Sequence, residues 1–168
     1  MPKEKTWYAL YVKSRSEKKV AVELEGNGID YYLPLEKQLR QWSDRKKWVE
    51  VPLFRSYIFV HIEQKDYYKV LQTRGAVKYI SFEGKAVPVP PQQIDAIKIY
   101  LQQKEPEMET NPSDWQEGKE VEVMSGKLTG LRGKLIKVNG KNRVKVEIEV
   151  VGSAIILNIS RKQLRIID

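Results

Sequence analysis

Residues 52–62, with the sequence Pro-Leu-Phe-Arg-Ser-Tyr-Ile-Phe-Val-His-Ile, decide the predicted fold of the first half of the chain. The stretch is rich in β-branched and aromatic residues and has no internal glycine, which is typical of a β-strand. Side chains alternate between the two faces of a strand. One face is mainly aliphatic and is expected to lie under a helix: Phe54, Ser56, Ile58, Val60 and Ile62. The opposite face carries Arg55, Tyr57, Phe59 and His61.

This second face permits two interpretations. Two large aromatic residues, Tyr57 and Phe59, lie between Arg55 and His61 with no aliphatic residue among them. Aromatic side chains beside a charge are typical of recognition surfaces. The same face could instead be covered by a second layer of the same domain. The alternation pattern by itself leaves both interpretations open.

Composition indicates a polyanionic partner. The chain has 168 residues, a net charge of +8 and a pI near 9.5, a balance that is typical of proteins that bind nucleic acid or nucleoprotein machines. No apolar run approaches the ~20 residues that a membrane-spanning helix requires. The N-terminus has no apolar signal region, and there is no cysteine for disulfides or thiol chemistry. We therefore expect a cytoplasmic protein with no membrane partner.

A basic cluster is predicted where the first strand meets the first helix. Thr6–Val12 has the pattern of a strand, and Ser14 with Glu17 fits a capping box that opens a helix ending at Gly26 or Gly28. Four cations gather at the start of this helix: Lys13, Arg15, Lys18 and Lys19. Positive charge there opposes the helix dipole unless an anion lies nearby. The cluster is either an anion-binding surface or a solvated basic turn.

A long β-hairpin is predicted over residues 37–48, with its turn at Ser43-Asp44 and its return arm leading into residues 52–62. It carries five Lys or Arg residues together with Trp42 and Trp48. Such a tip could stack on nucleic acid, or it could be an exposed loop kept soluble by its charges.

The remaining elements predict an α+β domain over residues 1–104. Residues 63–73 have helical spacing and end near Gly75, which leaves Thr73 and Arg74 at an exposed helix end. A strand at 77–82 and a helix that begins at Pro91 follow. The hairpin-like connections favour a mostly antiparallel sheet with packed helices.

The last third of the chain predicts a separate all-β domain. Residues 105–116 hold two prolines, four acidic residues and no basic residue, which is typical of a linker. Residues 117–168 contain five short β-rich runs with glycine-rich turns, including Asn139-Gly140. Such short strands bury enough surface only by curling into a small barrel. The chain therefore divides into a domain at 1–104, a linker at 105–116 and a barrel at 117–168.

No motif indicates catalysis. His61 is the only histidine, and no P-loop, Rossmann fingerprint or Gly-x-Ser-x-Gly sequence occurs. Carboxylates are scattered and no His-rich cluster has metal-ligand spacing. We therefore expect no enzyme activity, no cofactor and no metal.

Several motifs together resemble the NusG family of transcription elongation factors. They are Trp7-Tyr8, the 52–60 strand, Thr73-Arg74-Gly75, Val87-Pro88 and, in the barrel, Gly118-Lys119-Glu120 and Gly130-Leu131-Arg132. The resemblance covers nearly the whole chain and implies an N-terminal NGN domain followed by an SH3-like KOW barrel. The Leu-Phe-x-x-Tyr-x-Phe-Val strand and Thr73-Arg74-Gly75 resemble the specialised RfaH and UpxY antiterminators of polysaccharide operons more than the general factor.

The resemblance also implies binding partners. The first domain would bind the β′ clamp helices of RNA polymerase through an exposed hydrophobic pocket at Tyr11, Phe54, Tyr57 and Phe59. Strict alternation places Phe54 on the other face, so the strand start would need a bulge or twist. Non-template DNA would bind the basic surface at Lys13, Arg15, Lys19, Thr73 and Arg74. Holding polymerase and DNA together would suppress pausing and termination by population shift.

In the NusG family the KOW domain recruits the ribosomal protein NusE or the termination factor Rho. The residues expected to form an apolar partner patch here are Leu128, Leu131 and Ile159. Leu128 stands where the general factor typically has Phe, which disfavours Rho. The Val-rich strands favour a permanent barrel over the helical refolding known from RfaH, and we expect a monomer.

Two other functions remain open. A ribosome- or RNA-binding KOW protein without polymerase contact would share the basic charge and the barrel, but it gives no account of Tyr57 and Phe59. A small-molecule-binding α+β domain would require a concave apolar pocket.

Overall fold

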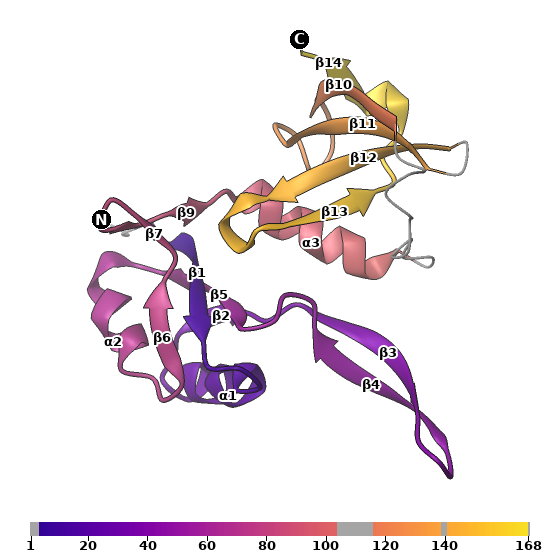
Figure 1. Cartoon of the computed structure of the whole chain (residues 1–168). Coiled ribbons are helices and arrows are strands. Elements are labelled where there is room, and N and C mark those ends of the chain that lie inside the picture. The colour runs from indigo at the N-terminus through magenta and orange to yellow at the C-terminus, as the bar shows by residue number, and fades with distance from the viewer. Residues whose placement is uncertain (1–3, 104–115, 139–140, 168) are drawn as a thin grey trace. The chain divides into compact units, whose positions relative to one another are not determined.

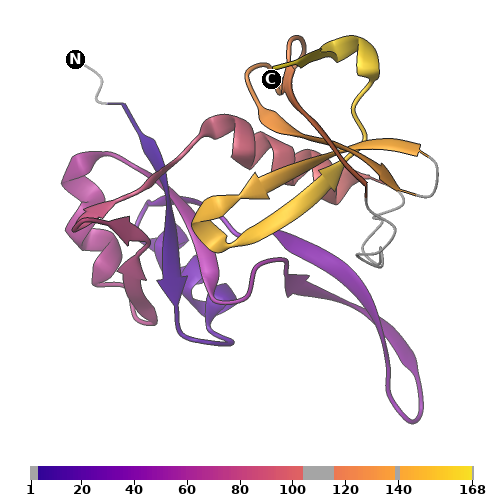
Figure 2. The same cartoon turned by 45° about the horizontal axis from the view of Figure 1, so that its top comes forward.

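The computed structural model describes residues 4–103, 116–138 and 141–167. The chain forms two compact units, Met1–Val89 and Pro90–Asp168, and each is described by itself. Figures 1 and 2 show the elements of each unit from two directions. The architecture is α+β with antiparallel sheets, as predicted.

The first unit is built on an antiparallel sheet with the strand order β2-β5-β1-β6, and β9 also pairs with β1. The strands are β1 (Thr6–Val12), β2 (Asp30–Tyr32), β5 (Tyr57–Ile62), β6 (Ala76–Tyr79) and β9 (Pro88–Val89). Its helices are α1 (Glu17–Gly26) and the short α2 (Tyr67–Leu71), which follows a 3-10 turn at Gln64–Asp66. The β1–β5 pair is the centre of the sheet and runs in register from Thr6↔Ile62 to Tyr11↔Tyr57.

The two helices cover one face of this sheet. The hydrophobic core there joins both helices to β1 and β5; its fully buried members are Leu10, Val12, Val20, Leu24, Ile58, Val60 and Val70. The predicted aliphatic face of the central strand is thereby confirmed for Ile58, Val60 and Ile62. Burying side chains of this size contributes about 1.5–3 kcal/mol each relative to leaving them exposed.

Two hairpins extend from the unit. The predicted basic hairpin forms a separate two-stranded sheet of β3 (Leu35–Gln41) and β4 (Lys46–Pro52), in register from Leu35↔Pro52 to Gln41↔Lys46. A second, shorter hairpin pairs β7 (Ser81–Phe82) with β8 (Lys85–Ala86).

The predicted capping box is wrong. Helix α1 begins at Glu17, its N-cap residue is Ser16, and no side chain caps it. Arg15 has a φ of 64°, so the chain turns between Ser14 and the helix. Glu17 is buried, and its carboxylate accepts a hydrogen bond from the Ser56 N–H at 3.3 Å. Because Glu17 binds a distant loop, it does not reach back to cap its own helix.

The central strand is shorter than predicted, because β5 begins only at Tyr57. Ser56 has a φ of 66°, a left-handed conformation that turns the chain just before the strand. Phe54 therefore escapes the alternation and packs edge to face on Phe59, with ring centroids 6.2 Å apart. The twist that the resemblance required is present, and both rings are buried: Phe54 is 6% exposed and Phe59 is 0% exposed.

The second unit contains helix α3 (Pro91–Gln102) and a five-stranded antiparallel sheet with the order β13-β12-β11-β10-β14. Its strands are β10 (Gln116–Val123), β11 (Arg132–Val138), β12 (Lys141–Ile148), β13 (Ser153–Leu157) and β14 (Leu164–Ile166). The sequence from Arg143 to Val150 alternates, which predicts one buried face made by Val144, Val146, Ile148 and Val150. The first three are buried, but Val150 lies in a 3-10 turn and is only half-buried. Pro91 begins α3, as predicted.

Helix α3 lies against β13 within this unit. The Gln103 amide, just after the helix, donates to the Ile156 carbonyl and accepts from the Asn158 N–H. The unit boundary at Val89–Pro90 thus falls before the predicted domain end at 104, because α3 packs with the sheet. The predicted linker lies almost wholly outside the described residues, as does the Asn139-Gly140 turn, so the three-part division stays a prediction.

Strand β10 approaches β11 very closely at Gly118, where the absence of a side chain leaves room for the neighbouring backbone. A Cβ atom at Gly118 would lie 2.0 Å from the Leu135 carbonyl oxygen, and the register of the pair shifts between Glu117 and Glu120. Only glycine permits this contact. The strand therefore bends at Gly118, as a small curled sheet requires.

We expect Phe59→Ala to destabilise the first unit by about 3–5 kcal/mol, since it removes a fully buried ring. Tyr57→Ala, in which the lost ring is only half-buried, is the control and should cost less. Urea denaturation followed by circular dichroism measures both. If Phe59→Ala and the wild type unfold at the same urea concentration, the Phe59 ring does not contribute to the packing as described.

We expect Gly118→Ala to destabilise the second unit by about 1–3 kcal/mol, because the new Cβ would collide with backbone that must shift. Gly26→Ala is the matched control, since a Cβ at Gly26 meets nothing within 4 Å. Thermal unfolding of both variants tests this, and a Gly118→Ala protein that melts like Gly26→Ala would refute it.

Candidate functional site

The four aromatic residues predicted to bind polymerase come together on β1 and β5. Tyr11 and Tyr57 are cross-strand partners whose rings meet edge to face, with centroids 5.7 Å apart. Both tyrosines are half-buried and have part of their surface available to a partner. Phe54 and Phe59 form a second edge-to-face pair.

The expected exposed pocket is wrong for the two phenylalanines. Both are buried, and the turn at Ser56 brings the Phe54 ring edge to face with Phe59. The second face of the central strand is therefore only partly accessible. Phe59 is packed in the interior, whereas Tyr57 keeps part of its surface exposed. His61, at the far end of this face, stacks on Trp7 with centroids 4.4 Å apart and planes 8° apart.

The predicted basic residues also come together. Lys13, Arg15 and Lys19 are exposed around the start of α1. The Lys13 N–H donates to the Gly75 carbonyl at 2.9 Å, and this bond brings the turn that contains Arg74 beside them.

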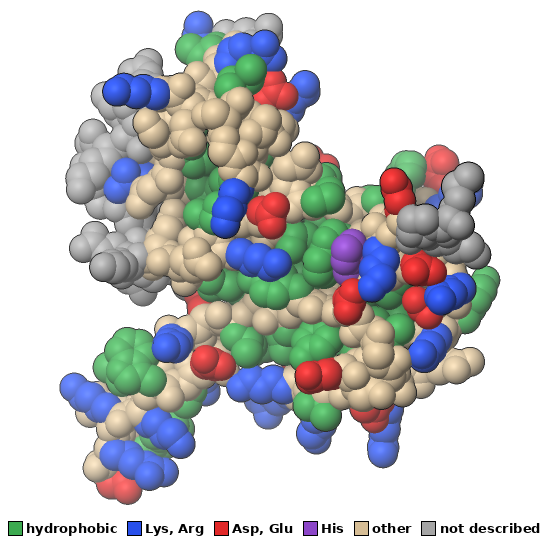
Figure 3. Space-filling model, turned by 180° about the vertical axis from the view of Figure 1, so that it is seen from behind, with side chains coloured by type: hydrophobic (Ala, Val, Ile, Leu, Met, Phe, Trp, Pro, Cys, Tyr) green, Lys and Arg blue, Asp and Glu red, His purple; other side chains and the backbone are tan. Residues whose placement is uncertain are grey.

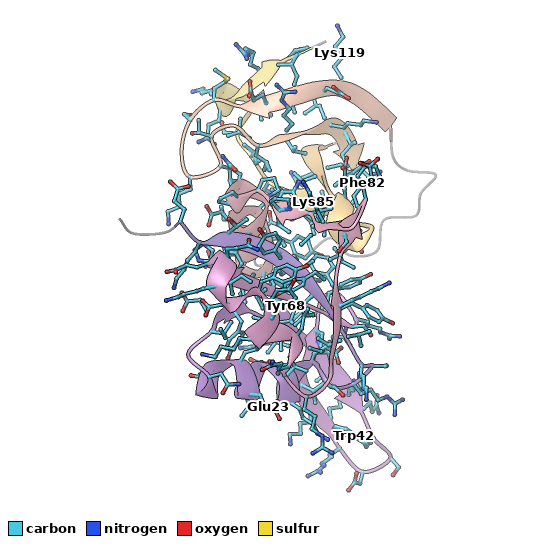
Figure 4. The ribbon with its side chains drawn as sticks, turned by 90° about the vertical axis from the view of Figure 1, so that its left-hand side faces the viewer. Glu23, Trp42, Tyr68, Phe82, Lys85 and Lys119 are labelled. Atoms are coloured by element: carbon cyan, nitrogen blue, oxygen red, sulfur yellow. The ribbon has the colours of Figure 1, made fainter. Side chains whose placement is uncertain are left out.

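The turn at residues 73–75 is held against α1. The Arg74 N–H donates to the Glu23 carboxylate at 2.9 Å, and Gly75 has a φ of 96°. A Cβ at Gly75 would lie 2.8 Å from a Val20 methyl carbon, so only glycine lets the turn pack this closely. Figure 4 labels Glu23 on α1.

Thr73 is buried, with 6% of its surface exposed, and the predicted exposed position is therefore wrong. The short α2 ends at Leu71, and the Thr73 N–H bonds back to the Val70 carbonyl, which draws the side chain inward. Its hydroxyl oxygen has no hydrogen-bond partner within the described part of the chain. Arg74 is exposed, as predicted.

Two carboxylates on α1 position this surface, and sequence reasoning missed both roles. Glu17 accepts from the Ser56 N–H, and Glu23 accepts from the Arg74 N–H. Neither partner lies near its carboxylate in sequence, and no local motif marks such contacts. Within the described part of the chain, both carboxylates bind backbone amides and neither forms an ion pair with the neighbouring cations.

The predicted partner patch of the second unit is only partly accessible. Leu128 and Leu131 are buried, at 6% and 5% exposure. The loop before β11 closes on itself, with the Leu131 N–H donating to the Leu128 carbonyl, and this turn directs both leucines inward. Ile159 is half-buried, so an exposed patch made by all three residues is wrong.

Two tyrosines of the first unit have strongly raised pKa values. Burial raises the pKa of Tyr32 to about 12. Burial also raises the pKa of Tyr79, whose hydroxyl donates to the Tyr67 carbonyl at 2.8 Å. Both phenols therefore stay protonated near neutral pH. Among residues 4–103, 116–138 and 141–167, no group of three His, Asp or Glu side chains could hold a metal ion.

No helix in the described part of the chain is both long enough and apolar enough to cross a membrane.

Comparison with known proteins connects these surfaces to a family. Residues 5–98 match the family model described as transcription termination factor NusG, and residues 117–149 match the KOW motif. A comparison with curated proteins gave no significant match. The solved structure entitled "Domain interaction in Thermotoga maritima NusG" is 21% identical over 98% of each chain, with a TM-score of 0.52, and shows the same fold. With more than half of its length matched by the family model, the chain belongs to the NusG family of non-enzymatic transcription elongation factors.

Proposed function

We propose that this protein is a specialised antitermination factor that binds the β′ clamp helices of RNA polymerase and the nearby non-template DNA. Members of the NusG family bind RNA polymerase. The proposed polymerase surface centres on Tyr11 and Tyr57, while the buried Phe54 and Phe59 hold that surface in place. Large aromatic rings that are partly exposed on a rigid sheet are the side chains that most often dominate binding energy.

One observation carries the proposal: the aromatic pair and the basic cluster meet at the same end of β1. Tyr11 lies two residues before Lys13, and Lys13 is bonded to the turn that presents Arg74. A partner on the tyrosines and a strand of DNA on the cations would therefore be held side by side. The free cations give the DNA contact its energy, because each neutralised phosphate releases counterions.

Bridging explains antitermination without catalysis. A factor that contacts polymerase and non-template DNA together binds the closed, elongating state more tightly than an opened or paused one. The equilibrium then shifts toward elongation by the difference between the two affinities. This activity would take place in the cytoplasm, with the protein acting as a monomer.

The specialised role is supported by residues rather than by the fold. The Leu53-Phe54 and Tyr57 pattern and the Thr73-Arg74-Gly75 turn resemble those of the RfaH and UpxY antiterminators of polysaccharide operons. For the second unit we propose the ribosomal protein NusE as a partner. Of the three residues expected to form its apolar patch, Ile159 is the one that remains partly accessible. The buried Leu128 offers Rho no aromatic contact.

We expect Tyr11→Ala/Tyr57→Ala to weaken binding of the full chain to core RNA polymerase by about 30-fold, the loss that a truncated aromatic hot spot causes. Phe82→Ala is the matched control, because it removes an aromatic ring that is 71% exposed elsewhere on the first unit, as labelled in Figure 4. Fluorescence anisotropy with labelled protein measures both. If the wild type binds ribosomes or RNA but not polymerase, the RNA-binding alternative replaces this proposal.

We expect Lys13→Ala/Arg74→Ala to leave binding to core polymerase unchanged and to weaken binding to an elongation complex with an open bubble. The loss should shrink as salt rises, because the contact is a screened charge interaction. Lys65→Ala/Lys85→Ala removes the same charge from other exposed positions and serves as control. If the two double variants lose the same affinity for the elongation complex, the loss reflects the lower net charge of the protein and not a DNA site at Lys13 and Arg74.

A further inference from the structure

The β3–β4 hairpin presents a cationic face that the proposed contacts do not use. The hairpin forms its own sheet and projects from the first unit, as Figures 1 and 2 show. From Lys37 to Trp48 it carries five basic residues and one acidic residue. Every residue from Leu39 to Trp48 is exposed.

The pairing register divides the tip of the hairpin into two faces. Arg40 lies directly opposite Lys47, and the Trp42 N–H bonds to the Arg45 carbonyl to close the turn. Side chains two positions apart on a strand share a face. One side, which we call the tip face, therefore holds Arg40, Trp42, Arg45 and Lys47. The opposite side holds two further pairs, Leu39 with Trp48 and Gln41 with Lys46, so it carries a single basic residue at the tip.

The charges on the tip face have no counter-charge in the described part of the chain. Arg40 and Lys47 are direct cross-strand partners, and like charges in that position destabilise a hairpin. Neither side chain makes a hydrogen bond or an ion pair there, and the Arg45 guanidinium lies 5.8 Å from the centre of the Trp42 ring. Figure 3 shows Lys and Arg side chains surrounding hydrophobic ones on the projecting hairpin. A polyanion would relieve this repulsion.

The exposed Trp42 side chain favours a polyanion whose own aromatic rings are accessible for stacking, which is a property of single-stranded nucleic acid. Trp42 is 45% exposed at the end of the hairpin, where Figure 4 labels it. Unpaired bases stack on such rings, whereas the faces of paired bases are covered by their neighbours in a duplex. Cations that flank an exposed indole are thus suited to single-stranded nucleic acid, with phosphates on Arg40 and Lys47 and a base on Trp42.

The hairpin is also connected to the basic cluster at α1. The Lys18 side chain donates to the Glu50 carbonyl on β4 at 2.7 Å, so the start of α1 lies against the base of the hairpin. A strand bound at Lys13 and Arg74 would lie near the base of this arm. This continuity favours DNA over RNA and over an acidic protein.

We propose that the tip face of the β3–β4 hairpin is a second binding site for single-stranded DNA, extending the contact to the non-template strand. This inference rests on the proposed function for its choice of DNA. The arm would hold unpaired bases away from their complementary strand, so it would help to keep the transcription bubble open.

The test measures binding of the full chain to a labelled 12-nucleotide oligodeoxythymidine across a series of salt concentrations. We expect Arg40→Ala/Lys47→Ala to weaken binding about tenfold and to lower the log–log salt slope by about 1.4, or about 0.7 for each lost phosphate contact. Lys85→Ala/Lys127→Ala removes the same charge at exposed positions elsewhere and should change neither value.

A matched pair of tryptophan variants tests the stacking. We expect Trp42→Ala to weaken binding about tenfold and to abolish most of the DNA-induced quenching of tryptophan fluorescence. Trp48→Ala, on the opposite face, should do neither. Equal losses for the two variants would overturn the assignment to the tip face.

The remaining outcomes separate this inference from the proposed function. If Lys13→Ala/Arg74→Ala weakens binding and the hairpin variants do not, the second site is wrong and the basic cluster stands. If only the hairpin variants lose affinity, the hairpin site stands and the cluster fails. No binding by the wild type, tighter binding of a 12-base-pair duplex, or tighter binding of oligouridine would overturn the proposal for single-stranded DNA.

Discussion

The pairing of β1 with β5 is the constraint on which the first unit depends. Its register, from Thr6↔Ile62 to Tyr11↔Tyr57, places Leu10 and Ile58 in the core under the helices. The same register joins Tyr11 to Tyr57 on the surface. A slip of one residue would exchange the two faces and destroy both the core and the aromatic pair, because side chains alternate strictly along a strand. The stability of the first unit and the proposed polymerase surface therefore depend on a single set of backbone hydrogen bonds.

Helix α1 connects that sheet to the charged surface. Its carboxylates at Glu17 and Glu23 bind backbone amides of two distant loops, and its Lys18 binds a carbonyl of the hairpin. A buried carboxylate requires such donors, since leaving it unpaired costs several kcal/mol. Of the two, Glu17 is buried and Glu23 is exposed, yet both bind backbone amides, and Lys13, Arg15 and Lys19 around them stay available to a polyanion. The basic character of the surface follows from this division of roles, as well as from the net charge.

Periodicity predicted most of the elements and few of the contacts. The alternation in β5 and β12 correctly identified the buried aliphatic faces, because an interior excludes water from every second residue, but it did not predict that Phe59 on the other face of β5 is buried as well. The same alternation placed Phe54 on the wrong face, because a pattern of alternating residues does not reveal the left-handed turn at Ser56. The exposed positions expected for Thr73 and Leu128 were wrong for a related reason: short turns redirected both side chains inward.

The sequence by itself determined the antiparallel α+β class, the basic hairpin and the family, because these depend on local propensity, hydrophobic period and motif order. Only the tertiary structure decided which aromatic rings are accessible and which cations are free. Tyr57 and Phe59 share a strand face in the sequence, yet one is half-exposed and the other fully buried. Accessibility depends on what packs across a residue from distant segments, and no local pattern along the chain encodes that packing.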